Sequence, residues 1–250
     1  MAASSTTVPA TEAAAGTAVT WTRPDGSTEV PGLAFGSTDA KGAVIVIQEW
    51  WGVTDDCKAQ ADYIAQQGYR VLIPDLYRGK LTLDAKEAEH TMTGLDWPGA
   101  VQDIAGAAKH LKEGGAEKVG VTGFCMGGAL ALASATLCPD IVASAPFYGT
   151  PPDGLADVST IKVPVLGQFG SEDDLQGFSD PTAVETLKGK LEKAGVEFEL
   201  VSHEGVGHGF MNSTPVGKEL NEKLGRPSHN PTAINAAWGH LLGFFGKHLA

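Results

Sequence analysis

The stretch Gly123-Phe124-Cys125-Met126-Gly127-Gly128 decides the fold, because it lies between a predicted strand over residues 118–122 and a predicted helix over 125–137. Glycines two residues before and two residues after Cys125 permit a sharp strand-to-helix turn, since a side chain at either place would obstruct the close approach of strand and helix. Such a turn projects the central side chain above the sheet. The start of the helix then favours the thiolate form of that side chain. The pattern therefore predicts a nucleophilic cysteine at residue 125.

The backbone amide of Met126 would lie at the start of the same helix. There it would point at the oxygen of a tetrahedral intermediate, as one donor of an oxyanion hole. In a purely structural interpretation, Cys125 is a small buried side chain and the glycines only allow packing. The strand, turn and helix around Cys125 favour the catalytic interpretation.

Outward from this turn, short β-branched runs alternate with helical segments. Strands are expected over residues 44–47, 70–73, 118–122, 142–145, 163–169 and 197–201, after a hairpin that joins 19–22 to 28–30. Helices are expected from Thr54 or Asp55 to about residue 65, and over 96–113, 125–137, 181–194 and from 230 onward. This alternation predicts an α/β fold, a mostly parallel sheet with helices on both faces and a ligand site at the carboxyl ends of the strands.

The first 17 residues are rich in Ala, Ser and Thr and lack the pattern of a secretory signal. We expect residues 1–17 to form a flexible tail, and residues 18–250 to form a single domain. The chain has no apolar run of the roughly 20 residues that a membrane-spanning helix requires.

The charge balance excludes some classes of partner. Thirty acidic residues against 18 basic ones give a formal charge of −12, which disfavours nucleic acid and anionic membrane surfaces. Three scattered cysteines predict neither a disulfide framework nor a zinc site, and they indicate a reducing, cytoplasmic compartment. The sequence has no phosphate loop and no paired-histidine metal motif, so no metal or organic cofactor is expected.

A nucleophile on such a turn needs an acid and then a histidine from later strand ends. Asp173 follows one predicted strand, and His208 lies in a glycine-flanked loop after the next. His208 would accept the proton of the nucleophile, and Asp173 would fix its tautomer. The neighbours Glu172 and Asp174 remain alternatives for the acid, and His203 remains an alternative for the histidine.

Five motifs together resemble the dienelactone hydrolase family. They are Gln48-Glu49-Trp50-Trp51-Gly52-Val53, Pro74-Asp75-Leu76-Tyr77-Arg78-Gly79, the turn around Cys125, Gly170-Ser171-Glu172-Asp173 and Gly207-His208-Gly209-Phe210. The resemblance implies an α/β-hydrolase fold and a Cys-His-Asp triad. It also implies that Glu49 takes the thiol proton when substrate binds, and that the amide of Trp50 is the second oxyanion donor. A buried carboxylate can serve as a base because burial raises its pKa.

The same resemblance suggests candidate substrate-binding residues. Trp50 and Trp51 would line the pocket, unless they only pack against each other. Tyr148 could reach the mouth of the pocket. Founding members bind a substrate carboxylate with two arginines. In this chain Asn212 occupies the second of these positions. The first arginine is shifted by one residue, to Arg78, and Lys80 could serve in its place. Phe210 and Asn212 complete the candidate set.

The leading hypothesis is a cysteine-dependent hydrolase of small esters or lactones that forms a thioester intermediate. The alternatives are an acyltransferase or another acyl-bond hydrolase with the same triad, and a non-catalytic protein that binds a small ligand or senses oxidation. We expect a small-molecule substrate, and a monomer or a weak homodimer.

Overall fold

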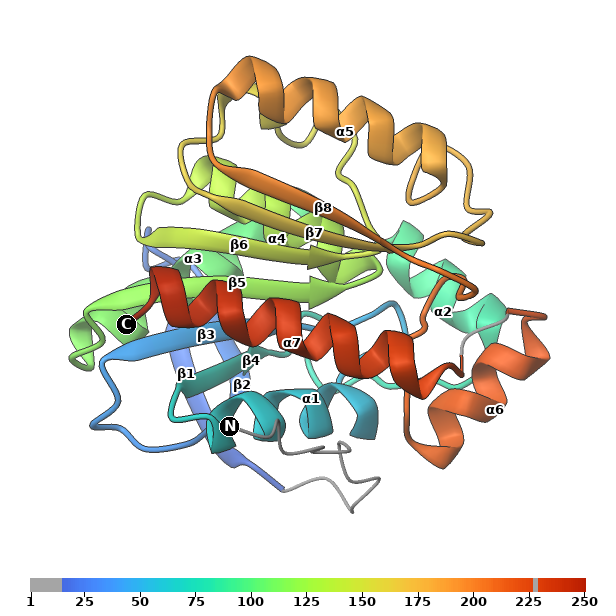
Figure 1. Cartoon of the computed structure of the whole chain (residues 1–250). Coiled ribbons are helices and arrows are strands. Elements are labelled where there is room, and N and C mark those ends of the chain that lie inside the picture. The colour runs from blue at the N-terminus through green and yellow to red at the C-terminus, as the bar shows by residue number, and fades with distance from the viewer. Residues whose placement is uncertain (1–14, 227–228) are drawn as a thin grey trace, which may run out of the picture.

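A computed structural model describes residues 15–226 and 229–250 of the chain. An eight-stranded sheet lies at its centre (Figure 1), in the order β1-β2-β4-β3-β5-β6-β7-β8. The strands are β1 (Thr17–Thr22), β2 (Glu29–Phe35), β3 (Gly42–Ile47), β4 (Arg70–Pro74), β5 (Lys118–Phe124), β6 (Ile141–Phe147), β7 (Val165–Gly170) and β8 (Phe198–His203). The β1–β2 and β2–β4 pairs are antiparallel, and the other pairs are parallel.

The middle of the sheet is covered on both faces. Residues 43–47 of β3 are completely buried, and β3 pairs with β4 on one side and with β5 on the other. A strand with two buried faces reads as a continuous apolar run, which is why it is recognisable in the sequence. The predicted hairpin is also confirmed, because Trp21 pairs with Val30 between β1 and β2.

The described part of the chain also contains seven α-helices and a short 3-10 helix. They are α1 (Asp55–Gln66), α2 (Ala85–Thr93), α3 (Trp97–Glu113), α4 (Met126–Leu137), η1 (Val158–Thr160), α5 (Pro181–Ala194), α6 (Pro215–Lys223) and α7 (Pro231–His248). Figure 1 shows α1 and α7 on one face of the sheet, with α3 and α4 on the other. None of the helices described is both long enough and apolar enough to cross a membrane.

Capping side chains explain where the predicted helices begin. The Thr54 hydroxyl accepts a hydrogen bond from the Cys57 amide, so Thr54 rather than Asp55 is the N-cap of α1. Asn230 caps α7, and a proline follows at the first helical position, as the sequence indicates.

Two helices near the carboxyl ends of the strands are not predicted by the sequence. Helix α2 buries only Ala88, and α6 buries only Gly217, Leu220 and Asn221, so neither has a long apolar stripe. Both lie beyond the end of the sheet toward which the β5 and β7 arrows point (Figure 1). They therefore lie at the edge of the sheet where a ligand site is expected.

The N-terminal boundary differs slightly from the prediction. Residues 1–14 of the expected tail lie outside the described residues, and β1 already begins at Thr17. The pairing of Thr17 with Ala34 extends the hairpin by a few residues beyond the predicted strand.

Candidate active site

Cys125 lies at the turn between β5 and α4. Its backbone has φ +57° and ψ −118°, a strained conformation for a residue with a side chain. A Cβ at Gly123 would lie 2.2 Å from the Gly127 carbonyl oxygen, and one at Gly127 would lie 2.4 Å from the Ile47 carbonyl oxygen. Both glycines are therefore required by close backbone packing, as the sequence predicts.

The thiol of Cys125 is buried but lines a cleft of about 530 Å³. Burial and the negative charge of Glu49 raise the pKa of this thiol well above its ordinary value. The charge of Arg226 and the amide of Met126, which donates to the sulfur, act in the opposite direction but do not overcome burial. The resting thiol is therefore protonated at neutral pH, and a nucleophilic role requires a base.

His208 and Asp173 meet at the carboxyl ends of β7 and β8. The Nδ1 atom of His208 lies 2.9 Å from the Oδ2 atom of Asp173, and both side chains are buried. An ionised carboxylate can only accept, so Nδ1 carries the hydrogen and Nε2 carries the lone pair. Nε2 is buried and has no hydrogen-bond partner in the described part of the chain. Burial lowers the pKa of His208, which keeps the ring in its neutral, basic form.

Ser179 is a third member of this group that the sequence does not indicate. Its hydroxyl lies 3.1 Å from Nδ1 of His208 and is fully buried in the loop before α5. With the hydrogen on Nδ1, the Ser179 oxygen accepts a second, shared branch of the bond to Asp173. No local pattern marks a serine in this role, because only the fold brings residues 179 and 208 together.

The alternative histidine lies in a different environment. Nε2 of His203 is 2.9 Å from the side-chain oxygen of Gln168, and the His203 ring packs against Phe210. Burial lowers the pKa of His203 to about 4. His208, and not His203, lies beside Asp173.

Glu49 and Asn212 form a buried pair. The Nδ2 atom of Asn212 donates to Oε2 of Glu49 at 2.9 Å. Burial raises the pKa of Glu49 to about 7, although the hydrogen bond from Asn212 favours the charged form. Asp56 on α1 accepts bonds from the Ser213 and Thr214 amides at 2.8 Å, and these bonds fix the segment that carries Asn212.

The aromatic candidates do not share one environment. Trp50 lines the cleft beside Cys125, whereas Trp51 packs with Ala88 and Leu220. Tyr148 is fully buried with its ring 5.0 Å from that of His208, and it also contacts the buried ring of Phe210. Tyr148 and Phe210 therefore pack around His208.

Arg78 and Lys80, the expected anion-binding residues, are not in the cleft of Cys125. Arg78 Nη2 lies 2.6 Å from Oδ2 of Asp103, and Nε of Arg23 lies 2.7 Å from the other oxygen of that carboxylate. These residues and Lys80 line a separate cavity of about 350 Å³. Arg78 follows the strand end, as predicted, but its charge is held by Asp103, which comes from α3.

The positive charge in the cleft comes instead from Arg226, three residues after α6. The sequence does not indicate this role, because α6 itself is not predicted and Arg226 lies in no recognisable motif. The lining also includes one acidic side chain, that of Glu89 on α2. Most of the other lining side chains are apolar: Trp50, Met92, Trp97, Pro152, Leu175 and Phe178.

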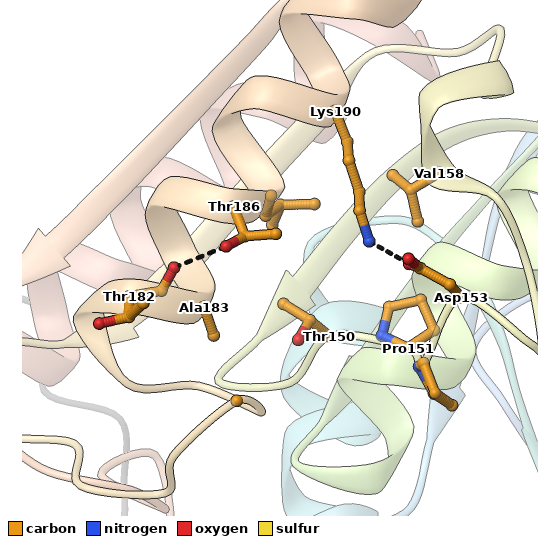
Figure 2. Close-up of a pocket in the computed structure, with 11 residues that line it drawn as sticks. Thr150, Pro151, Asp153, Val158, Thr182, Ala183, Thr186 and Lys190 are labelled. Carbon is orange, nitrogen blue, oxygen red and sulfur yellow. Dashed lines mark hydrogen bonds and ion pairs between the residues drawn. The ribbon is translucent and has the colours of Figure 1, made fainter.

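A second cavity of about 250 Å³ adjoins the cleft and shares Thr150, Pro152 and Gly177 with it. Figure 2 shows Thr150 and Pro151 on one side of this cavity and helix α5 on the other. An ion pair between Lys190 and Asp153 bridges its two sides (Figure 2).

The strand order, the turn at Cys125 and the later strand ends that carry Asp173 and His208 together define an α/β-hydrolase. The family model described as the dienelactone hydrolase family matches residues 30–249. The chain belongs to the dienelactone hydrolase family, and is thus a hydrolase of the ester or lactone class.

Individual relatives agree with this assignment. The chain is 33% identical to "Protein usf" of Aquifex pyrophilus, over 82% of this chain and 88% of that protein. It is 30% identical to a putative carboxymethylenebutenolidase of Aquifex aeolicus, over 83% of this chain and 88% of that protein. The crystal structure of a putative dienelactone hydrolase from Klebsiella pneumoniae superposes with a TM-score of 0.74 at 24% identity, and covers 94% of this chain and 100% of its own. The superposition on the Klebsiella pneumoniae structure shows the fold alone.

Proposed function

We propose that the chain hydrolyses small esters or lactones with Cys125 as the nucleophile and a thioester as the intermediate. The observation that carries the proposal is the position of Cys125, which lines the cleft at a strained turn between β5 and the start of α4. This is the geometry that a nucleophile elbow requires.

In the first half of the reaction, the thiol gives up its proton as the sulfur attacks the acyl carbon. Glu49 is suited to receive that proton, because its pKa of about 7 is close to neutral pH. The amides of Met126 and Trp50 would stabilise the oxyanion. The proton that Glu49 took from the thiol would then pass to the leaving oxygen as the carbon–oxygen bond breaks, and this leaves the acyl group on sulfur.

In the second half, water attacks the thioester. Nε2 of His208 would take a proton from that water, and the hydrogen bond from Nδ1 to Asp173 would hold the ring in place. Collapse of the second tetrahedral intermediate releases the acid and returns the proton to the sulfur. The unpartnered, buried Nε2 atom supports this role, since it is free to accept a proton.

The test is an assay of purified protein with 4-nitrophenyl acetate and a panel of small lactones. We expect the wild type to release free acid without any added acyl acceptor, and we expect Cys125→Ala and His208→Ala to be inactive. Mass spectrometry of protein quenched during turnover should detect one acyl group on Cys125. A Cys125→Ala variant with wild-type activity would refute the proposal, and acid release that requires an acceptor would indicate acyl transfer instead.

The compartment and the assembly state remain predictions. Cys57, Cys125 and Cys138 are free thiols, which is compatible with the expected reducing, cytoplasmic location. A monomer or weak homodimer would be recognised by light scattering over a range of concentrations.

A further inference from the structure

Glu49 and Asp56 are buried carboxylates that line one cavity of about 180 Å³, separate from the cleft of Cys125. Asp55 also lines this acidic cavity, and no lysine, arginine or histidine among the described residues does. In the same part of the chain, neither Glu49 nor Asp56 forms an ion pair. Buried charges without a counter-ion are costly, so the acidic cavity favours a bound cation.

Hydrogen bonds satisfy Asp56 but leave other polar atoms of the cavity available. Besides the two amides that donate to its Oδ1, Asp56 accepts the Thr214 hydroxyl on Oδ2 at 2.5 Å. The side-chain amide of Asn212, which donates to Glu49, lines the cavity and is 4% exposed. Its Oδ1 atom is buried and has no hydrogen-bond partner within the described chain. An occupant should therefore donate hydrogen bonds, to Oδ1 of Asn212 and to the Glu49 carboxylate.

The mouth of the acidic cavity is apolar. Leu81, Leu83 and Val216 line it and are exposed, and they are three of the four exposed large apolar side chains among the described residues. These three side chains are termed the apolar rim. The Thr82 amide donates to the Trp51 carbonyl oxygen at 3.1 Å, which holds the rim segment against the cavity wall. Clustered, exposed apolar side chains are typical of a binding site.

The size and chemistry of the cavity restrict its occupant. Its volume is below the range of roughly 300–1,000 Å³ that drug-sized ligands occupy. No three His, Cys, Asp or Glu side chains in the described chain are grouped so that they could hold a metal ion. A primary ammonium group supplies three N–H donors, and the ring of Trp51, which lines the cavity, is of the kind that attracts cations. A short alkyl chain on that group would match the apolar rim.

The electrostatics of Glu49 also favour a second positive charge nearby. Burial and the charge of Asp56 raise the pKa of Glu49 to about 7, whereas Asn212 and Arg226 act in the opposite direction. The titratable and charged side chains that interact with Glu49 are Cys57, Cys125, Tyr148, Asp56 and Arg226. Among these Arg226 alone is positive, and it lines the cleft of Cys125 rather than the acidic cavity.

We propose that the acidic cavity binds a small primary alkylammonium ion, with its ammonium group beside Glu49 and its alkyl chain against the apolar rim. The ammonium group donates to Oδ1 of Asn212 and to the Glu49 carboxylate. Its charge stabilises that carboxylate, so a larger fraction of Glu49 is ready to take the thiol proton. This effect on turnover, unlike the binding itself, rests on the proposed function.

Binding is measured by isothermal titration calorimetry at pH 8 with Cys125→Ala, so that no turnover interferes. The probe is n-butylammonium chloride. We expect saturable binding, at least about 10-fold tighter than that of methylammonium chloride, because each buried methylene contributes about 4-fold. At the same ionic strength, tetramethylammonium chloride, potassium chloride and the uncharged n-butanol should show no saturable binding.

Three variants in the Cys125→Ala background locate the site. Glu49→Gln keeps the shape of the side chain without its charge, and should weaken n-butylammonium binding by at least about 10-fold. Val216→Ser makes the rim polar, and should weaken the binding of n-butylammonium but not of methylammonium. Glu89→Gln is the matched control, because it removes a carboxylate from the cleft of Cys125 instead, and should change binding by less than about 2-fold.

The effect on turnover is measured with wild-type protein and 4-nitrophenyl acetate. Saturating n-butylammonium should lower the pH midpoint of kcat/KM by about one unit, as a nearby opposite charge does for a carboxylate. From a midpoint near 7, kcat/KM should therefore rise by about 5-fold at pH 6 and change little at pH 8. Cys125→Ala with the same amine measures its direct reaction with the ester.

The inference is overturned if n-butylammonium does not bind saturably, or if Glu49→Gln binds it as tightly as the parent. An equal loss in Glu89→Gln would place the amine in the cleft of Cys125, and would overturn the inference as well. Binding that leaves the pH midpoint of an active wild type unchanged would contradict the position beside Glu49. Failure of the proposed function has a different signature, because Cys125→Ala would then still hydrolyse the ester, whatever the amine does.

Discussion

Asn212 donates a hydrogen bond of 2.9 Å from its Nδ2 atom to Oε2 of Glu49, and both side chains are buried. The partner of this carboxylate is therefore a neutral amide. A neutral donor stabilises the charged form only modestly, and burial consequently raises the pKa of Glu49 to about 7. Glu49 is thus a proton acceptor with a near-neutral pKa, and the pKa of the Cys125 thiol is raised by burial and by the charge of Glu49.

This relationship predicts the pH dependence of the reaction. If ionised Glu49 takes the thiol proton, kcat/KM should rise with pH to a plateau, with a midpoint near 7. Asn212→Ala removes a hydrogen bond that favours the carboxylate, so the pKa of Glu49 should increase and the midpoint should move to higher pH. A pH profile with 4-nitrophenyl acetate measures the shift. A midpoint that is unchanged or lower in Asn212→Ala would contradict this role of the pair.

Glu49 should also reduce stability at neutral and alkaline pH. Its pKa is raised from 4.5 to about 7 in the folded chain, so its favourable contribution is complete below pH 4.5 and is lost as the pH rises through 7. This difference in the pKa of Glu49 corresponds to a change of about 3 kcal/mol at most in the free energy of unfolding. Glu49→Gln should therefore be more stable than the wild type in urea at pH 8.

The advantage of Glu49→Gln should shrink as the pH falls toward 4. His208, whose pKa is lowered, acts in the opposite sense by destabilising the fold below its ordinary pKa of 6.5. The prediction therefore concerns the difference in the free energy of unfolding between Glu49→Gln and the wild type, measured at each pH. A variant that is less stable than the wild type at pH 8 would show that Glu49 is stabilised as an anion.

The two partners of His208 Nδ1 should differ in importance. Asp173→Asn removes the acceptor that fixes the tautomer, and should lower kcat by about 10³-fold to 10⁴-fold, as in other triads. Ser179→Ala removes only the shared branch at 3.1 Å, and should lower kcat by less than about 10-fold with KM nearly unchanged. Ser159→Ala, at a serine of η1 that does not line the cleft, is the matched control. Equal losses in Asp173→Asn and Ser179→Ala would contradict the tautomer assignment.

The turn that carries Cys125 should tolerate no Cβ at Gly127. Gly127→Ala would bring a methyl group 2.4 Å from the Ile47 carbonyl oxygen and 2.6 Å from that of Gln48. We expect a loss of at least about 2 kcal/mol in the free energy of unfolding, because both clashes are with backbone atoms, which cannot move away cheaply. Gly243→Ala in α7 is the control, since nothing lies within 4 Å of its Cβ and it should stabilise the helix by about 0.5–1 kcal/mol. A fully stable Gly127→Ala protein would disprove the packing argument.

The sequence by itself determined the α/β order and the central turn, because both depend on local properties. Apolar runs predict the buried strands, and glycine spacing around Cys125 predicts the strand-to-helix turn. The resemblance to the dienelactone hydrolase family, carried by five motifs at strand ends, is confirmed by the family model over residues 30–249.

Tertiary structure alone decided the contacts within the site. Ser179 reaches His208 and Asn212 reaches Glu49 because the loops after β3, β7 and β8 lie at one edge of the sheet. Arg78 was expected to bind substrate, but Asp103 from α3 holds it, and no motif pairs these two residues. Arg226 enters the cleft after α6, a short polar helix that buries only Gly217, Leu220 and Asn221. Periodicity and glycine spacing are local, whereas the charge and hydrogen-bond partners of a buried group depend on elements far apart in the chain.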